Sequence, residues 1–157
     1  MIRQRPLIAV VDDEESVRKS LRRLLVASEL DATVYASGQE FLDSLGGRQP
    51  DCLVLDLQMP GLTGLEVQRA LARARVRFPT IIITAHDEPE TRARCLAAGA
   101  VAYLCKPLHD ELLLDAITTA VDPIVGSVAA QKRADPQPAA RLEGGIESPP
   151  GPRPACE

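Results

Sequence analysis

The chain has 157 residues, of which 45% are hydrophobic, and it carries a formal net charge of −4. This length and composition indicate one domain with an apolar core, and the acidic balance argues against non-specific binding to nucleic acid or anionic membranes. Its apolar runs are far shorter than the roughly 18 residues that a membrane-spanning helix needs, so no membrane segment is expected.

Apolar runs and helical patterns alternate five times along the chain. The expected strands are residues 7–11, 32–35, 52–56, 80–84 and 101–105, and several are continuously apolar, as in strands covered on both faces. The second helix is expected over residues 38–45, and the fourth should end at Gly99, which suits a left-handed C-terminal cap. The other three helices are expected from apolar stripes with helical spacing. These stripes comprise Val17, Leu21, Leu24 and Leu25, then Val67, Ala70, Leu71 and Ala74, then Leu113, Ile117, Ala120 and Val121.

This alternation predicts an α/β fold with a doubly wound, five-stranded parallel sheet in the flavodoxin-like order 2-1-3-4-5, since crossovers between parallel strands are right-handed. We expect a single domain over residues 1–121. Residues 122–157 contain seven of the 13 prolines and four of the 10 glycines, without apolar periodicity. That composition predicts a flexible, proline-rich tail that supports no core.

Polar residues stand where four of the expected strands end, which is the edge where such sheets bind ligands. Close carboxylates raise one another's pKa values, and Mg²⁺ would relieve their repulsion because it takes few carboxylates and keeps several waters. A carboxylate beside a cation and an amine is suited to act as a nucleophile toward phosphorus. The residues at this edge are Asp12, Asp13, Asp56, Thr84 and Lys106.

Taken alone, each of these residues has an ordinary interpretation. Aspartate is a common helix N-cap and turn residue, and a lysine is usually a solvated surface residue. Thr84 suits a strand, and Tyr103 suits a core. The coincidence of Asp12 and Asp13 with Asp56 on one edge favours a binding site over a helix cap.

Four short motifs stand at the ends of the expected strands. They are Val11-Asp12-Asp13-Glu14, Asp56-Leu57-Gln58-Met59-Pro60-Gly61 with Gly64, Ile83-Thr84-Ala85, and Tyr103 with Lys106-Pro107. In this order they resemble the receiver domain of bacterial two-component response regulators, over about residues 5–121. The runs LVLDLQMPGLTGLEVQ and GAVAYLCKP are most similar to the FixJ-type subfamily.

The resemblance implies a phosphorylation site. Asp56 would be the phosphoacceptor and would take its phosphoryl group from a sensor histidine kinase. Asp12, Asp13 and Asp56 would hold Mg²⁺, and the backbone carbonyl of Gln58 would complete the protein ligands.

The resemblance also assigns roles around the phosphoryl group. Lys106 would bind it and would precede a cis peptide bond to Pro107, which is rare enough to need a reason. Thr84 would contact the phosphoryl group and form a switch pair with Tyr103. Such a chain is a signalling protein rather than an enzyme, because it promotes only the phosphorylation and dephosphorylation of its own aspartate.

The chain departs from FixJ-type regulators, which usually continue into a helix-turn-helix domain. Only 36 residues follow Val121, so we expect a receiver without an output domain that signals by contact with an unknown downstream protein. Leu108, Ala102 and Cys105 differ from the subfamily at its usual output surface, so the partner is expected to differ. The alternative is the regulatory receiver of a transcription-control system, which dimerises through its fourth helix, fifth strand and fifth helix and acts on DNA through a partner chain.

Two other activities of this fold are disfavoured. A phosphohydrolase with an aspartate nucleophile needs a second aspartate two residues later, where this chain has Gln58. A nucleotide or flavin binder needs a loop rich in Gly, Ser or Thr after the first strand, where residues 12–15 are all acidic and would repel phosphate.

The cysteines indicate the compartment. They are widely spaced and form no C-x-x-C pair, which favours reduced thiols and a cytoplasmic location over a disulfide framework or a zinc site. We interpret all four as structural or incidental: Cys52, Cys95, Cys105 and Cys156.

Overall fold

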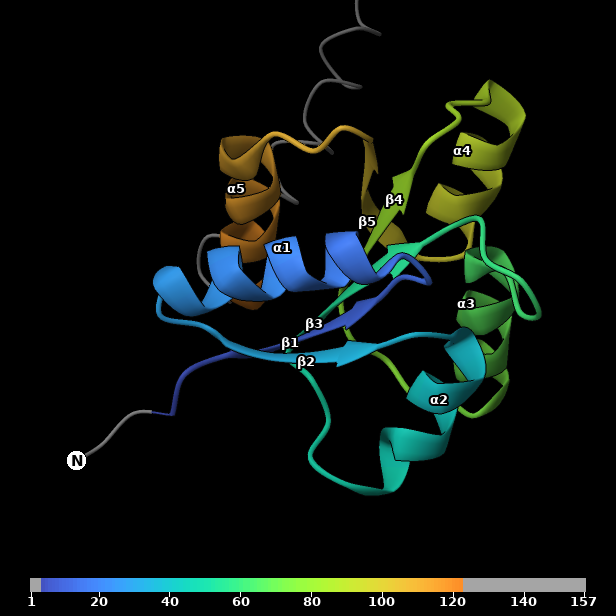
Figure 1. The fold of residues 1–157 in the computed structure, drawn as a ribbon. Coiled ribbons are helices and arrows are strands. Elements are labelled where there is room, and N and C mark those ends of the chain that lie inside the picture. The colour runs from blue at the N-terminus through green and yellow to red at the C-terminus, as the bar shows by residue number, and fades with distance from the viewer. Residues whose placement is uncertain (1–3, 123–157) are drawn as a thin grey trace, which may run out of the picture. The chain divides into compact units, whose positions relative to one another are not determined.

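A computed structural model describes residues 4–122, and Figure 1 shows its strands and helices alternating along the chain. The strands are β1 (Leu7–Val11), β2 (Asp31–Tyr35), β3 (Cys52–Asp56), β4 (Thr80–Thr84) and β5 (Ala100–Cys105). The helices are α1 (Glu15–Ala27), α2 (Gly38–Asp43), α3 (Gly64–Arg73), α4 (Pro89–Ala97) and α5 (Asp110–Val121), with a short 3-10 helix, η1 (Ser44–Gly46).

The five strands form one parallel sheet in the order β2-β1-β3-β4-β5. β1 pairs with β2 on one side and with β3 on the other, so the strand order changes direction between β1 and β3. This confirms the predicted doubly wound sheet and its order. In such sheets the crevice at the carboxyl ends of these two strands is the place where ligands bind.

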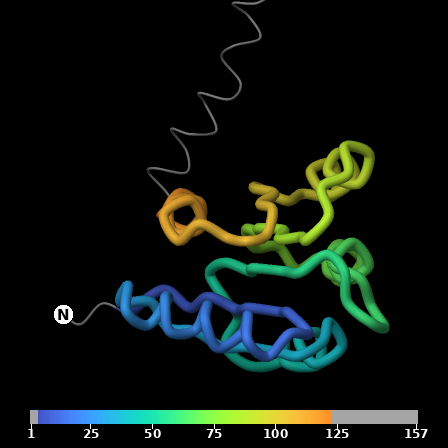
Figure 2. Tube along the Cα trace, turned by 45° about the horizontal axis from the view of Figure 1, so that its top comes forward, coloured from blue at the N-terminus to red at the C-terminus, as the bar shows by residue number. Residues whose placement is uncertain are grey.

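Helices cover both faces of the sheet, as Figures 1 and 2 show. Helices α1 and α5 pack on one face, and α2, α3 and α4 pack on the other. Alternate residues of a buried strand contribute to the two cores, so that Val10 of β1 faces one core and Val11 the other. Every residue of β1, β3 and β4 is buried, which explains why these strands are apolar in sequence except at their ends.

Element boundaries differ from the sequence predictions by only a few residues. β2 and β5 each begin one residue earlier than predicted, and the second predicted helix divides into α2 and η1. The prediction that Ala74 lies on the apolar stripe of the third helix is wrong, because this residue is the exposed C-cap of α3. Gly99 follows the C-cap of α4 with φ +111°, the left-handed conformation that glycine adopts most readily.

The start of α3 is fixed against the end of β3. Thr63 and Glu66 form a capping box, in which Thr63 Oγ1 accepts from the Glu66 N–H at 3.2 Å and Glu66 Oε1 accepts from the Thr63 N–H at 2.9 Å. A Cβ at Gly64 would lie 2.6 Å from the carbonyl oxygen of Asp56 and 2.9 Å from Cα of Leu57. Only glycine allows so close an approach, and this contact supports the backbone that carries Asp56.

Two predictions concern chain segments beyond this fold. The flexible tail predicted over residues 122–157 lies, apart from Asp122, outside the described residues. Among residues 4–122, no helix has the length and apolar character needed to cross a membrane.

Candidate functional site

Three carboxylates lie together at the carboxyl ends of β1 and β3. Asp12 is fully buried, Asp13 beside it is exposed, and Asp56, the last residue of β3, is 3% exposed. One oxygen atom from each lies within 4.8 Å of the others. Such a group of oxygen ligands suits a hard divalent cation such as Mg²⁺.

Lys106 supplies the positive charge of the site. Its Nζ lies 2.9 Å from Asp12 Oδ2, 3.1 Å from Glu14 Oε1 and 3.7 Å from Asp56 Oδ1. The residue follows β5, and its peptide bond to Pro107 is cis. The ammonium group therefore reaches from the carboxyl end of β5 to the buried carboxylates of Asp12, which follows β1, and Asp56, which ends β3.

Burial raises the pKa of Asp56 to about 7, and the charge of Asp12 adds to the rise. The ammonium of Lys106 and the backbone N–H of Gln58, which is an exposed residue, both lower the pKa but do not cancel that rise. Burial also acts to lower the pKa of Lys106, but its hydrogen bond and charge contact with Asp12, together with Asp56 and Glu14, raise that pKa overall. Lys106 is therefore charged at neutral pH, whereas Asp56 needs further positive charge nearby to be fully ionised.

Thr84 lies at the end of β4 and is fully buried. Its Oγ1 donates a hydrogen bond to the carbonyl of His86 at 3.0 Å and accepts one from the N–H of His86 at 3.1 Å. The carbonyl of Thr84 accepts from the N–H of Lys106 at 2.7 Å. The hydroxyl is thus engaged with the start of the β4–α4 connection, while the backbone ties the end of β4 to the end of β5.

Tyr103 of β5 is 9% exposed and belongs to the core between the sheet and α4. The guanidinium carbon of Arg92 lies 4.9 Å from the centre of its ring, and Arg92 Nη2 lies 3.3 Å from Asp87 Oδ2. Burial raises the pKa of the Tyr103 hydroxyl. The ring is therefore held under α4 by a cation–π contact that links β5 to the β4–α4 connection.

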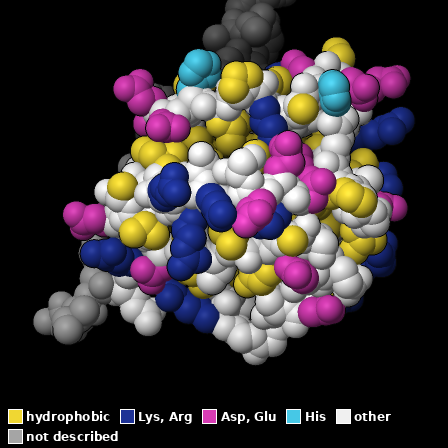
Figure 3. Space-filling view, in the orientation of Figure 1, with side chains coloured by type: hydrophobic (Ala, Val, Ile, Leu, Met, Phe, Trp, Pro, Cys, Tyr) yellow, Lys and Arg dark blue, Asp and Glu magenta, His cyan; other side chains and the backbone are white. Residues whose placement is uncertain are grey.

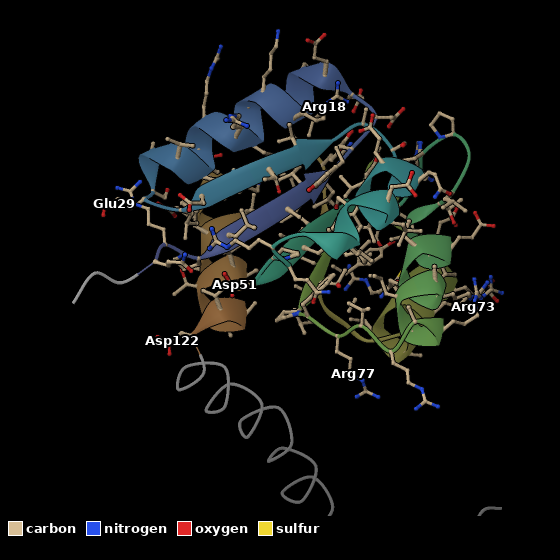
Figure 4. The ribbon with its side chains drawn as sticks, turned by 90° about the horizontal axis from the view of Figure 1, so that it is seen from below. Arg18, Glu29, Asp51, Arg73, Arg77 and Asp122 are labelled. Carbon is tan, nitrogen blue, oxygen red and sulfur yellow. The ribbon has the colours of Figure 1, made fainter. Side chains whose placement is uncertain are left out.

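The sequence predictions missed three residues around this site. Glu14 pairs with Lys106, Arg18 Nη1 donates to the carbonyl of Asp12 at 2.8 Å, and Arg92 covers Tyr103. Figure 4 labels Arg18 on α1. The sequence signal for Glu14 was the acidic run that it shares with Asp12, whereas Arg18 and Arg92 stood in ordinary helical patterns.

The comparisons with known proteins agree with this geometry. Residues 8–118 match the family described as the response regulator receiver domain. The chain belongs to this family. A solved receiver protein from Burkholderia phymatum is 47% identical with a TM-score of 0.67, and the match covers 74% of this chain and 95% of that one.

Two curated relatives carry names that point to nodulation and to transcriptional regulation. Nodulation protein W of Bradyrhizobium diazoefficiens is 39% identical over 116 residues, 74% of this chain and 51% of the relative. Transcriptional regulatory protein FixJ of Rhizobium meliloti is 34% identical over 122 residues, 78% of this chain and 60% of that protein. These matches confirm the resemblance to FixJ-type receivers, and they span only 51% and 60% of the length of these two relatives.

Proposed function

We propose that this receiver accepts a phosphoryl group on Asp56 from a sensor histidine kinase and signals the change by contact with another protein. The observation that carries the proposal is the placement of Lys106 Nζ between Asp12 and the buried Asp56. A nucleophile, a fixed ammonium and a group of carboxylates suited to a cation are the parts that phosphoryl transfer to an aspartate requires.

The cation proposed for the site is Mg²⁺. Asp12, Asp13 and Asp56 would hold it with the backbone carbonyl of Gln58. The donor set fits this ion, because the three carboxylates offer oxygen atoms only and lie within 4.8 Å of one another. When bound, Mg²⁺ supplies positive charge that favours the ionised form of Asp56 and stabilises charge on phosphoryl oxygens.

In the transfer step, a carboxylate oxygen of Asp56 forms a bond to phosphorus while the bond from phosphorus to the histidine nitrogen of the kinase breaks. The electron pair of that bond returns to the imidazole. Lys106 would then move its ion pair from Asp12 and Asp56 to the phosphoryl oxygens, since its Nζ already lies 3.7 Å from Asp56 Oδ1. Beyond this transfer and the hydrolysis of the aspartyl phosphate, in which water attacks phosphorus and inorganic phosphate leaves, we propose no separate substrate.

The kinase docking surface that we propose lies beside Lys106. An open groove of about 590 Å³ lies between α1 and the β5–α5 connection, and Val17, Leu21 and Leu108 supply apolar wall. Figure 3 shows Lys and Arg side chains over α1 and Asp and Glu side chains gathered next to its N-terminal end. A partner seated in this groove would present its phosphohistidine next to Lys106 and Asp56.

Thr84 and Tyr103 are the proposed switch pair. To contact a phosphoryl group on Asp56, the Thr84 hydroxyl would have to leave the His86 backbone, to which it makes two hydrogen bonds. That exchange would pull the β4–α4 connection inward and disturb the contact between Arg92 and Tyr103. The surface of α4 and β5 would then differ between the two states.

Phosphorylation is tested by intact-mass measurement after incubation with a small acyl phosphate and Mg²⁺. The wild-type chain should gain one phosphoryl group and Asp56→Asn none. Asp115→Asn, which removes an exposed acid of α5, is the matched control and should label like the wild type. Equal labelling of Asp56→Asn and the wild type would remove Asp56 as the acceptor.

A second function is favoured by the names of the relatives, since FixJ is called a transcriptional regulatory protein. In this alternative the receiver forms a phosphorylation-dependent homodimer through α4, β5 and α5 and acts on DNA through a partner chain. Leu96 of α4 and Val101 of β5 are 45% and 38% exposed and would supply apolar contact area. A molar mass that doubles on phosphorylation in size-exclusion light scattering supports the dimer, and an unchanged mass removes it.

We further propose that residues 1–121 suffice for phosphorylation and that the protein acts in the cytoplasm. Cys52, Cys95 and Cys105 are free thiols, which suits a reducing compartment. A chain that ends at Val121 should label as efficiently as the full chain. Loss of labelling on truncation would show that the domain boundary is wrong.

A further inference from the structure

The end of the sheet opposite the carboxylates carries a groove lined by apolar residues and arginines. It lies between the C-terminal ends of α3 and α4 and the starts of β4 and β5, and its volume is about 1000 Å³. Leu71, Val76, Phe78 and Val101 supply apolar wall, and Arg75 and Arg77 lie at its edge. The groove shares no residue with the site around Asp56.

The rim of this groove is a cluster of unpaired positive charge. Four arginines fall within nine residues, and no acidic residue occurs in the sequence between Glu66 and Asp87. Arg75 and Arg77 are exposed, and neither forms an ion pair within residues 4–122. Figure 4 shows Arg73 and Arg77 extending outward from this part of the molecule. On a chain of net charge −4, such a cluster marks a local surface that attracts anions.

The wall of the groove also contains a buried acceptor. Gln68 of α3 is 5% exposed and lines the groove, and its Nε2 donates to the carbonyl of Cys95 in α4 at 3.2 Å. Its Oε1 has no hydrogen-bond partner in the part of the chain that the structure describes. A buried acceptor without a partner costs free energy. Because this oxygen is buried, a ligand that brings an N–H or O–H group would meet it only if the Gln68 side chain turned toward the groove.

The backbone around the groove is held in place before any ligand arrives. The N–H of Val76 donates to the carbonyl of Leu71 at 2.9 Å, and the N–H of Arg75 donates to that of Ala72 at 3.1 Å. These two bonds form the pattern that commonly closes the C-terminal end of a helix. Since the bonds fix the positions of Arg75 and Val76 relative to α3, binding would order only side chains.

From these contacts we propose that the groove docks an acidic peptide segment of a partner protein. Apolar side chains of the peptide occupy the wall of Leu71, Val76 and Phe78, and its carboxylates pair with Arg75 and Arg77. A backbone N–H meets Gln68 Oε1 once that side chain turns toward the groove. A nucleic acid would use the arginines and leave the apolar wall uncovered. A second copy of this chain, docked by its acidic edge around Asp56, would build an open-ended filament rather than a closed dimer.

The test is a titration of the full, ¹⁵N-labelled chain followed by amide chemical shifts. The probe is a short synthetic peptide in which leucines alternate with glutamates, and its control carries glutamine at each glutamate position. The acidic probe should shift the signals of Val76, Arg77 and the Gln68 side-chain amide, and the glutamine probe should not. Shifts confined to other surfaces, or equal effects of both probes, would overturn the proposal.

Charge-reversal variants decide whether the groove itself binds. Arg75→Glu combined with Arg77→Glu should weaken binding by about 10-fold or more, as expected for paired interface arginines. Arg5→Glu combined with Arg22→Glu changes the total charge equally at exposed sites outside the groove and should leave binding within about twofold of the wild type. If both pairs weaken binding alike, general electrostatic attraction explains it and the docking site is wrong.

Two further outcomes separate this proposal from its alternatives. If the variant with Arg75→Glu and Arg77→Glu does not fold, the variant with Arg75→Gln and Arg77→Gln replaces it. This second variant removes the same contacts with a smaller change in charge and should also weaken binding. Shifts at the groove that grow with protein concentration in the absence of peptide would show self-association and overturn the peptide proposal, as would stronger binding of a short DNA duplex. Phosphorylation of Asp56 should proceed normally in the Arg75 and Arg77 variants. A failure of the peptide-docking proposal would therefore leave the proposed function untouched.

Discussion

Replacing Asp56 by asparagine should stabilise the fold, and the gain should grow as the pH rises. Asp56 is 3% exposed, and burial together with Asp12 raises its pKa from 3.8 to about 7. A carboxyl group with a raised pKa binds its proton more tightly in the folded state than in the unfolded state. Its stabilising contribution is therefore complete below the unfolded pKa and is lost as the pH rises through the folded pKa.

The size of the effect follows from the pH range between the unfolded and the folded pKa of Asp56. Between about pH 5 and pH 7 the folded protein keeps a proton that the unfolded chain has released, and each pH unit costs about 1.4 kcal/mol. The free energy of unfolding of the wild type should thus fall by roughly 2–3 kcal/mol relative to that of Asp56→Asn across this range. Asparagine has nearly the same shape and does not titrate, so it isolates the effect of the charge.

The assay is urea unfolding followed by circular dichroism at about pH 5 and about pH 8, with a chelator present to exclude divalent cations. Asp115→Asn, at an exposed position, is the control and should follow the wild type at both pH values. Free energies of unfolding that depend on pH in the same way for wild type and Asp56→Asn would refute the reasoning, because they would show that the ionisation of Asp56 is not opposed by the fold.

Three further predictions concern the cation, the switch and the backbone. Millimolar Mg²⁺ should raise the melting temperature of the wild type and not that of Asp13→Asn, because binding to the folded state alone stabilises it; a melting temperature indifferent to Mg²⁺ would contradict the site. Thr84→Ala should still label in the intact-mass assay but should lose the roughly 5- to 150-fold change in partner affinity on phosphorylation that such linkage produces; an undiminished change would point to another loop. Gly64→Ala should lower the free energy of unfolding by about 1–3 kcal/mol, because its Cβ meets the backbone of Asp56; unfolding curves identical to the wild type would show that α3 moves away freely.

The fold was predictable because several of its strands are buried along their whole length and can be recognised from local sequence as apolar runs. β1, β3 and β4 are buried on both faces and are apolar except at Asp56, Thr80 and Thr84, and their bounds agree with the prediction at both ends. β2 is only partly buried along its length, and β5 has only two buried residues, Ala100 and Tyr103. At such edge strands the first residue is decided by pairing with a neighbour, which local composition does not encode, and both predictions began one residue late.

The site was predictable only as far as topology brings strand ends together. Asp12, Asp56 and Lys106 were placed at one edge because parallel strands share their carboxyl ends. The pairing of Lys106 with Glu14 depends on the rotation of α1 relative to β5, and the contact of Arg92 with Tyr103 depends on where α4 packs. These helix positions are set by the whole core, so no local pattern indicated them.

The most direct test of the central claim is to locate the phosphoryl group after transfer. The full chain is phosphorylated with a small acyl phosphate and Mg²⁺, reduced with borohydride to convert the aspartyl phosphate to homoserine, and digested for peptide mass spectrometry. Conversion of Asp56 alone, lost when Lys106 is replaced by alanine or when Mg²⁺ is chelated, is the result that this account predicts. Conversion of Asp12 or Asp13 with Asp56 unchanged would contradict it.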